Sequence, residues 1–79
     1  MSVDVLMPKL GESITEGTIL EWKKSVGDDI KKDETLLEIS TDKVDSEIPS
    51  PESGKIIQIL YNVNDVVPVG EVIAKIGSH

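Results

Sequence analysis

Short apolar runs alternate with turn-forming residues along the whole chain. Val, Ile and Leu dominate the runs, and Gly, Pro, Asn and Asp separate them, which is typical of strands joined by tight turns. No window of about 11 residues has a helical period. The pattern predicts strands at Val3–Met7, Thr18–Trp22, Asp29–Ile30, Leu36–Ser40, Val44–Ile48, Lys55–Leu60, Val66–Val67 and Val72–Ile76. We therefore predict an all-β fold, a flattened barrel or sandwich of two four-stranded antiparallel sheets.

An internal repeat relates the two halves of this pattern. When the chain is shifted by 37 residues, Gly17–Ser40 lies over Gly54–Gly77 without a gap. Core positions and turn positions both agree, as in the pairs Gly17 with Gly54, Ile19 with Ile56, Val26 with Val63, Gly27 with Asn64, Asp28 with Asp65, Glu34 with Glu71, Leu36 with Ile73 and Ile39 with Ile76. Loose similarity between any two strand-turn-strand segments is the simpler explanation. The joint agreement favours two halves related by a pseudo-twofold axis.

The composition excludes several classes of protein. A chain of 79 residues has room for one domain, expected over residues 1–77, with residues 78–79 as the start of a linker or an added tail. Fifteen acidic residues against eight lysines give a net charge of −7, which disfavours nucleic acid as a partner. No apolar run is long enough to span a bilayer, so we expect no membrane partner. The chain has no Cys and its one His is the last residue, which argues against a hydrolase or other free-standing enzyme.

One lysine lies at a predicted hairpin turn. Lys43 stands in Thr41-Asp42-Lys43-Val44, between two predicted strands. Asp42 is expected to bend the backbone through a side-chain hydrogen bond, and Lys43 then projects from the tip on a flexible stem. Seven other lysines compete with it, so composition alone favours a solubilising surface residue. The repeat predicts that this hairpin and the C-terminus lie at opposite ends of the molecule.

The sequence resembles the lipoyl domain of the acyltransferase subunit of 2-oxo acid dehydrogenase complexes. The resemblance covers nearly the whole chain and rests on landmarks at consistent spacing: Met7-Pro8-Lys9-Leu10-Gly11-Glu12-Ser13, Glu16-Gly17-Thr18-Ile19, Trp22, Gly27-Asp28, Thr41-Asp42-Lys43-Val44, Ile48-Pro49-Ser50-Pro51 and Gly54. It implies that Lys43 is the covalent attachment site of lipoic acid. The domain would be a non-catalytic carrier whose parent chain is a dihydrolipoyllysine acyltransferase.

The resemblance also implies partners. A lipoate-attaching enzyme would modify Lys43, with Asp42 and Val44 fixing the turn and helping recognition. The arm would then visit a thiamine-diphosphate-dependent 2-oxo acid decarboxylase, the acyltransferase core and a dihydrolipoyl dehydrogenase. The decarboxylase is expected to read a surface loop formed by Leu10, Gly11, Glu12, Ser13, Ile14 and Thr15. We expect a monomeric domain in a bacterial cytoplasm or, as the less favoured compartment, in a mitochondrial matrix.

Three alternatives compete with this interpretation. A biotinyl carrier domain has a similar fold, but Met usually flanks its lysine on both sides, whereas Asp42 and Val44 flank Lys43. The glycine-cleavage carrier protein is longer and lacks the signature near Met7. An interaction module with an unmodified lysine would share the sandwich fold. The acetyl, succinyl and branched-chain carriers share these motifs, and the sequence from Met7 to Glu16 slightly favours the succinyl or branched-chain type.

Overall fold

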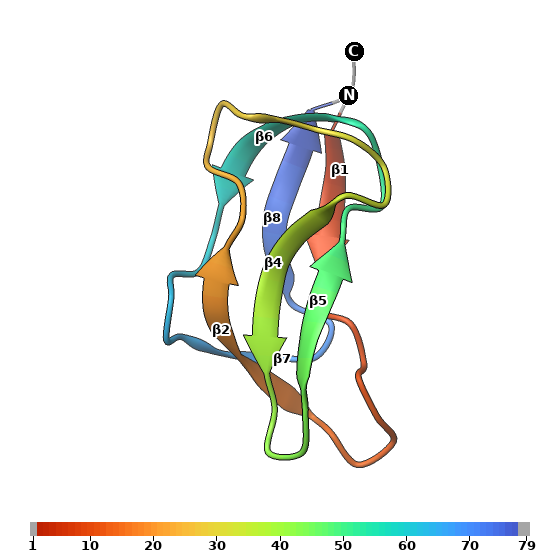
Figure 1. The fold of residues 1–79 in the computed structure, drawn as a ribbon, viewed down its shortest axis with the longest axis vertical. Helices are drawn as coiled ribbons and strands as arrows, with labels where there is room; N and C mark the ends of the chain where they lie inside the picture. Colours follow the sequence, from red (N-terminus) through yellow and green to blue (C-terminus); the bar gives the residue numbers. More distant parts are fainter. Residues whose placement is uncertain (1, 78–79) are drawn as a thin grey trace.

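Eight strands and their turns form the fold of residues 2–77, the part of the chain that our computed structural model describes (Figure 1). The strands are β1 (Ser2–Leu6), β2 (Glu16–Trp22), β3 (Asp29–Ile30), β4 (Thr35–Ser40), β5 (Asp45–Pro49), β6 (Gly54–Ile59), β7 (Val66–Pro68) and β8 (Val72–Gly77). The molecule measures 36 × 20 × 18 Å. None of the described residues forms a helix long and apolar enough to cross a membrane.

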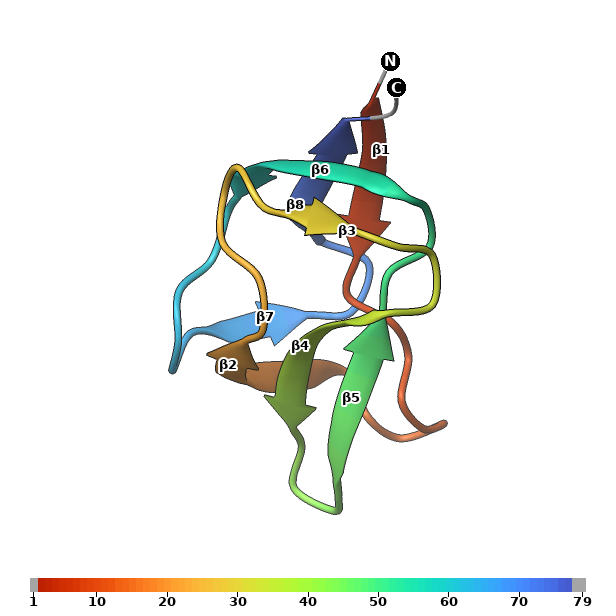
Figure 2. The same ribbon diagram turned by 45° about the horizontal axis from the view of Figure 1, so that its top comes forward.

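The strands build two four-stranded antiparallel sheets (Figure 2). One sheet has the order β1-β8-β6-β3 and the other has the order β5-β4-β2-β7. The edge strands β1, β3, β5 and β7 each have one neighbour, and no strand of residues 2–77 pairs across the two sheets. The all-β prediction and its sandwich form are confirmed. The barrel form is wrong, because the sheets do not close.

The predicted pseudo-twofold relation is present in the structure. The strand order β5-β4-β2-β7 corresponds to β1-β8-β6-β3, and the burial pattern along β4 is the same as along β8. The left-handed turn residues also correspond: Gly27 and Asn64 have φ values of 95° and 76°, and Asp33 and Gly70 have 72° and 94°. Glycine adopts this region freely, and Asn and Asp tolerate it better than other residues. The turn chemistry therefore repeats together with the core.

The two sheets do not coincide with the two halves of the sequence. Strand β3, from the first half, pairs with β6 of the second half. Strand β7, from the second half, pairs with β2 of the first. Turns reinforce this exchange, because the Gly27 N–H donates to the Ile56 carbonyl at 2.7 Å and the Asn64 N–H donates to the Ile19 carbonyl at 2.8 Å. Each half therefore completes the sheet of the other.

The aliphatic residues predicted for the strands fill the space between the sheets. The residues of this core are Val5, Met7, Ile19, Ile30, Leu36, Leu37, Ile39, Ile48, Ile56, Val67, Ile73, Ala74 and Ile76. Trp22 is half-buried against them, and its Nε1–H donates to the Tyr61 carbonyl at 3.0 Å. Burying aliphatic side chains contributes about 1.5–3 kcal/mol for each fully buried residue. In a chain without Cys, this core and the strand ladders hold the fold.

Strand boundaries differ from the prediction at two informative places. Strand β1 ends at Leu6, after a register shift between Val5 and Leu6, so Met7 lies beyond the strand although it is buried. Strand β5 begins at Asp45, because Val44 takes part in the turn before it. The second change places Val44 with Lys43 at the tip of the hairpin. The site is built on that tip.

Candidate functional site

The hairpin between β4 and β5 holds the predicted lysine at one end of the molecule. The ladder of β4 and β5 ends with the pair Ser40 and Asp45, which leaves residues 41–44 as the tip. Ser2 and Gly77 pair at the start of β1 and the end of β8. Figure 1 shows these two strand ends at the top of the molecule and the hairpin tip at the bottom. The predicted separation of the hairpin from the C-terminus is confirmed as far as the end of β8, and residues 78–79 lie outside the described residues.

A threonine hydroxyl closes the tip. The N–H groups of Lys43 and Val44 donate to Thr41 Oγ1 at 3.3 and 3.1 Å. The same hydroxyl donates to the Val44 carbonyl at 2.8 Å, and the Thr41 N–H donates to that carbonyl at 3.0 Å. The Asp42 side chain makes no such hydrogen bond within the described residues, so the prediction that Asp42 closes the turn is wrong. Ser and Thr hydroxyls also form such turns, and Thr41, two residues before the lysine, was the overlooked sequence signal.

Lys43 is exposed and its amine is free of ion pairs within the described chain. The ion pairs of residues 2–77 use Lys23, Lys24 and Lys75 instead. Both neighbours of Lys43 are also exposed, with 48% of Val44 accessible. An exposed amine on a four-carbon stem can reach an enzyme's active site without disturbing the fold. This geometry suits a lysine that receives a covalent group.

The predicted recognition loop divides into anchors and exposed residues. Ile14 is buried, and Leu10 is half-buried and packs against the core. The Ile14 N–H donates to the Gly11 carbonyl at 3.2 Å, which closes a turn within the loop. The other members, Glu12, Ser13 and Thr15, are exposed. The anchors hold the loop in place and leave the exposed members available to a partner.

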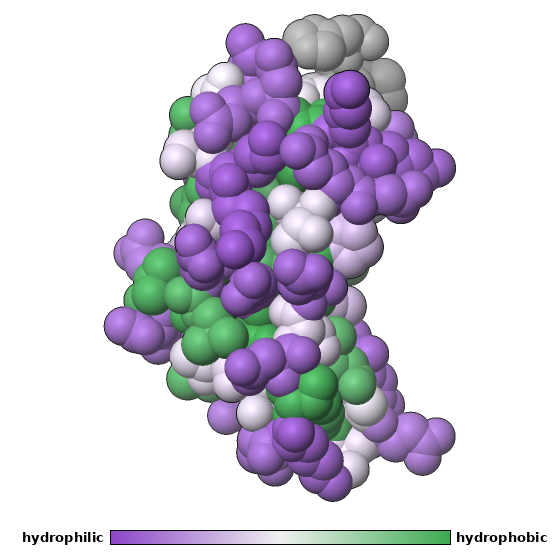
Figure 3. Space-filling view, viewed as in Figure 1, coloured by the Kyte–Doolittle hydropathy of each residue, from purple (hydrophilic) through white to green (hydrophobic). Residues whose placement is uncertain are grey.

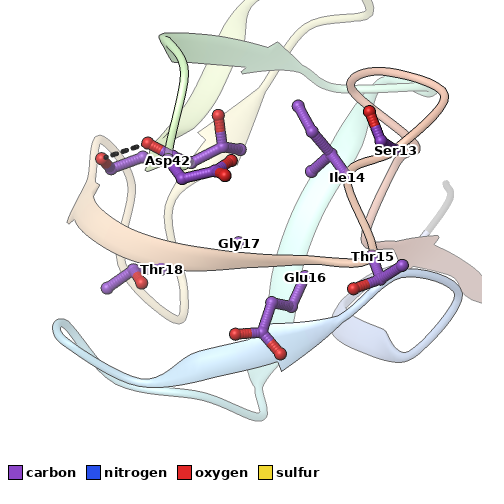
Figure 4. A pocket seen from close by; sticks show the side chains of 9 residues that line it. Ser13, Ile14, Thr15, Glu16, Gly17, Thr18 and Asp42 are labelled. Carbon is purple, nitrogen blue, oxygen red and sulfur yellow. Dashed lines mark hydrogen bonds between the residues drawn. The ribbon is translucent and has the colours of Figure 1, made fainter.

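The loop and the hairpin face each other across β2. A cavity of about 490 Å³ lies between them, lined by Ser13, Ile14, Thr15, Glu16, Gly17, Thr18, Ser40, Thr41 and Asp42. Figure 4 shows Ser13 and Ile14 on one side and Asp42 on the other, with Gly17 of β2 between. The structure therefore brings the two predicted recognition elements together. Leu10 does not line this cavity and instead lines an apolar groove of about 360 Å³ between β1 and β5.

Three glutamates lie side by side across the sheet that carries the hairpin. Glu38 of β4 pairs in register with Glu21 of β2 and with Glu47 of β5. Lys23 Nζ lies 3.1 Å from Glu21 Oε1 and 3.2 Å from Glu38 Oε1. Its hydrogen bonds, first to Glu21 and then to Glu38, raise the pKa of Lys23 above its ordinary value. No ion pair of the described residues includes Glu47.

The symmetry-related positions of the other sheet carry balanced charges. There Lys75 of β8 lies between Asp4 and Gln58, and Lys75 Nζ is 3.8 Å from Asp4 Oδ1. Opposite charges at paired positions stabilise a sheet, and like charges at paired positions destabilise it. At these paired positions the excess of negative charge therefore lies on the sheet that carries the hairpin. Figure 3 shows hydrophilic residues along much of the face over β4.

The acidic turns outside the hairpin act as structural caps. The Ser25 N–H donates to Asp28 Oδ2 at 2.8 Å, and the Asn62 N–H donates to Asp65 Oδ2 at 2.7 Å. The described residues contain no group of three side chains that could hold a metal ion. His79 lies outside the described residues. The Lys43 hairpin combines exposure, a defined turn and a neighbouring cavity.

Comparisons with known proteins agree with this geometry. The biotin/lipoyl family model, described as "Biotin-requiring enzyme", matches residues 3–76. The chain is 62% identical over 76 residues to the dihydrolipoyllysine-residue acetyltransferase component of the pyruvate dehydrogenase complex of Corynebacterium glutamicum. It is 50% identical over 74 residues to the dihydrolipoyllysine-residue succinyltransferase component of the 2-oxoglutarate dehydrogenase complex of Staphylococcus saprophyticus. These matches cover 96% and 94% of this chain, but only 11% and 18% of the two relatives.

A solved structure matches the chain over nearly its whole length. It is the lipoyl domain of the 2-oxoglutarate dehydrogenase complex of Azotobacter vinelandii, with a TM-score of 0.79 and 37% identity. The match covers 96% of this chain and 96% of that domain. This similarity favours the lipoyl over the biotinyl branch, as do the flanks Asp42 and Val44. The chain belongs to the biotin/lipoyl family, and within that family it is a lipoyl domain.

Proposed function

We propose that this domain carries lipoic acid as an amide on Nζ of Lys43. The observation that carries the proposal is an exposed, unpaired amine at the tip of a defined hairpin. The residues fit the group, because the tip offers an amine with open space around it and no carboxylate within ion-pairing distance in the described chain. When attached, lipoic acid supplies a dithiolane that accepts an acyl group together with two electrons.

The chain's own part in the attachment is that of a nucleophile. The deprotonated amine of Lys43 attacks the activated carboxyl carbon of lipoate, the activating group leaves, and the nitrogen releases a proton to solvent. The amide is uncharged, so attachment removes one positive charge from a domain of net charge −7. The exposed carboxylates of Asp42 and Asp45 then have no positive charge at the tip with which to form an ion pair. Neutralising Lys43 thus keeps the arm free to move.

The domain itself acts as a carrier without catalytic groups. The relatives named above are acyltransferase components of pyruvate and 2-oxoglutarate dehydrogenase complexes. We infer a parent acyltransferase chain, and four partners for the arm: the attaching enzyme, the thiamine-dependent decarboxylase, the acyltransferase core and the dihydrolipoyl dehydrogenase. The hairpin tip points away from the end of β8. A chain continuing beyond β8 would therefore tether the domain at the end opposite the arm.

Internal symmetry supports a recognition role for the loop. The Met7 N–H donates to the Glu71 carbonyl and the Ser50 N–H donates to the Glu34 carbonyl, each at 2.8 Å, so Met7 and Ser50 occupy equivalent places. From there the chain needs only residues 50–53 to reach β6, but it uses residues 7–15 to reach β2. The fold can therefore make this connection with a shorter loop. The extra length lies beside the hairpin, as expected of a surface that a decarboxylase reads.

The attachment is tested by mass spectrometry. The domain and a Lys43→Arg variant are incubated with lipoate, ATP and a lipoate ligase, and in parallel with biotin, ATP and a biotin ligase. We expect one lipoyl group on the wild type, located at Lys43 by peptide mapping, and none on the variant. A biotin adduct in its place supports the biotinyl alternative. An unmodified wild-type domain supports an interaction module.

The loop is tested separately from the attachment. Glu12→Lys with Ser13→Ala should leave lipoylation unchanged but lower the rate of reductive acylation by the decarboxylase at least tenfold. Glu52→Lys, in the short symmetry-related loop, makes the same charge change at the other end of the molecule and should have no effect. Equal rates for the loop variant and the wild type would rule out recognition through Glu12 and Ser13.

The acyl group is proposed from the degree of similarity. The sequence near Met7 slightly favoured a succinyl or branched-chain carrier, but the pyruvate dehydrogenase relative is 62% identical and the 2-oxoglutarate dehydrogenase relative 50%. We therefore propose an acetyl carrier. Reductive acylation with pyruvate and its decarboxylase should be faster than with 2-oxoglutarate and its decarboxylase. The reverse order would restore the succinyl assignment.

A further inference from the structure

We propose that the Thr41 hydroxyl is a positioning residue for the modification of Lys43. It holds the backbone of residues 41–44 in the single turn geometry that the attaching enzyme recognises. This inference rests on the proposed attachment of lipoate to Lys43 and deepens it. Thr41 does not touch the reacting amine in the structure. It acts through the backbone N–H groups of Lys43 and Val44, to which its oxygen is hydrogen-bonded.

The hydroxyl makes most of the hydrogen bonds at the tip. Beyond the last ladder pair, Ser40 with Asp45, the one backbone hydrogen bond among residues 41–44 runs from the Thr41 N–H to the Val44 carbonyl. The N–H groups of Lys43 and Val44 have Thr41 Oγ1 as their acceptor. The hydroxyl proton goes to the Val44 carbonyl. One side chain thus accepts twice and donates once, which uses the full capacity of a hydroxyl.

Side-chain packing does not hold the tip. Asp42, Lys43 and Val44 are all exposed, and Val44 is excluded from the core. The other hydroxyl nearby, on Ser40, donates to the Thr41 carbonyl at 3.5 Å, the limit of a hydrogen bond. Without the Thr41 hydroxyl, the tip would keep one backbone hydrogen bond and could rotate its peptide groups freely in water. The lysine would then leave its backbone at many angles.

Three other turns of the domain are capped by a carboxylate, whereas the turn at Ser50 is capped by a hydroxyl, as at Thr41. Asp28 caps the Ser25 N–H, Asp65 caps the Asn62 N–H, and Glu34 Oε1 caps the Lys31 N–H at 3.0 Å. A carboxylate cap beside Lys43 would place a negative charge where it could form an ion pair with the amine. A neutral hydroxyl fixes the turn without this pairing. A hydroxyl cap therefore suits a turn whose lysine must lose its proton to react.

The test compares two variants of Thr41, one that loses the hydroxyl group and one that loses the methyl group. Thr41→Val keeps the shape and removes the acceptor, whereas Thr41→Ser keeps the hydroxyl. We expect Thr41→Val to raise the KM of the ligase for the domain about tenfold with kcat unchanged, because a competent turn populated at about one tenth raises the apparent dissociation constant by the same factor. Thr41→Ser should stay within about twofold of the wild type.

Amide hydrogen exchange gives a second readout, which separates local loosening of the turn from a general loss of stability. In Thr41→Val the N–H groups of Lys43 and Val44 should exchange at least tenfold faster, while the core amides of Ile39 and Ile76 keep their wild-type rates. Thr41→Asn supplies another acceptor oxygen and should restore KM and protection in part. This variant decides the question if Thr41→Val folds poorly.

The outcomes separate this inference from the function on which it rests. A wild-type domain that accepts no lipoate would overturn the proposed attachment. A wild type modified at Lys43, with Thr41→Val modified at the same KM and kcat, would overturn the positioning role and leave the attachment intact. A fall in kcat at constant KM would also overturn it, because a shifted turn population acts on KM.

Discussion

Alanine at Gly54 should destabilise the domain far more than alanine at the symmetry-related Gly17. Both glycines are buried at the start of equivalent strand segments, and both lie where the opposite strand approaches closely. A Cβ at Gly54 would overlap the Gly77 carbonyl oxygen and lie 3.0 Å from its carbon. A Cβ at Gly17 would lie 2.6 Å from Ile39 Cγ2 and 3.6 Å from the Met7 side chain. One clash is with backbone and the other with side chains.

The two kinds of clash differ in how they can relax. The Ile39 side chain can shift without breaking a ladder hydrogen bond, so Gly17→Ala should cost about 1 kcal/mol, the low end of the range for overpacking. Gly77 pairs with both β1 and β6, so its carbonyl cannot move without breaking ladder hydrogen bonds. Gly54→Ala should therefore cost about 3 kcal/mol. A domain of this size is stable by only about 4–12 kcal/mol, so the second loss is severe.

Thermal unfolding followed by circular dichroism measures both effects. For a domain of 60–100 residues, 1 kcal/mol corresponds to about 4–8 °C. We expect Tm to fall by about 12–24 °C in Gly54→Ala and by about 4–8 °C in Gly17→Ala. A Tm for Gly54→Ala within about 3 °C of the wild type, or a larger fall for Gly17→Ala, would refute the backbone-clash argument.

Three further substitutions test the charges and the turns. Hydrogen bonding from the Lys31 N–H, followed by the Lys24 side chain, lowers the pKa of Glu34 below 4.5, so this carboxylate stabilises the fold above that pH and the contribution is lost as pH falls. Urea midpoints between pH 3 and 7 should therefore fall more steeply below pH 4.5 in the wild type than in Glu34→Gln, and parallel curves would contradict the assignment. Glu47→Lys should stabilise the domain by about 0.2–1 kcal/mol in urea unfolding, because it places a positive charge opposite Glu38 in the ladder. The control reverses the charge of an exposed carboxylate outside the ladder. An equal gain in that control would show that net charge is responsible. Asn64→Gly should leave the stability nearly unchanged, whereas Asn64→Val should lower it by about 1–2 kcal/mol, because a β-branched residue does not readily adopt the φ of 76° at this position. A Val variant as stable as the wild type in urea unfolding would contradict this prediction.

The sequence alone determined the elements and their pseudo-symmetry. Strand formation depends on alternating apolar residues, and turns depend on local residues such as Gly27 and Asn64. Both can therefore be predicted from short segments of the sequence. The repeat of 37 residues then showed that two halves share a core pattern. The lysine was found through the family motif around it, because Lys43 does not differ from the other lysines in composition or spacing.

Only the tertiary structure decided which strands pair. Strand β3 joins β6 and β7 joins β2, so each sheet mixes the two halves, and a local pattern carries no information about a distant partner. The same holds for the ladder of Glu21, Glu38 and Glu47, whose members come from three strands. The cavity between loop and hairpin likewise exists only once β2 lies between them. The hydrogen bonds of Thr41 are local in sequence, yet whether Thr41 or Asp42 would close the turn depended on side-chain geometry that the residue types left open.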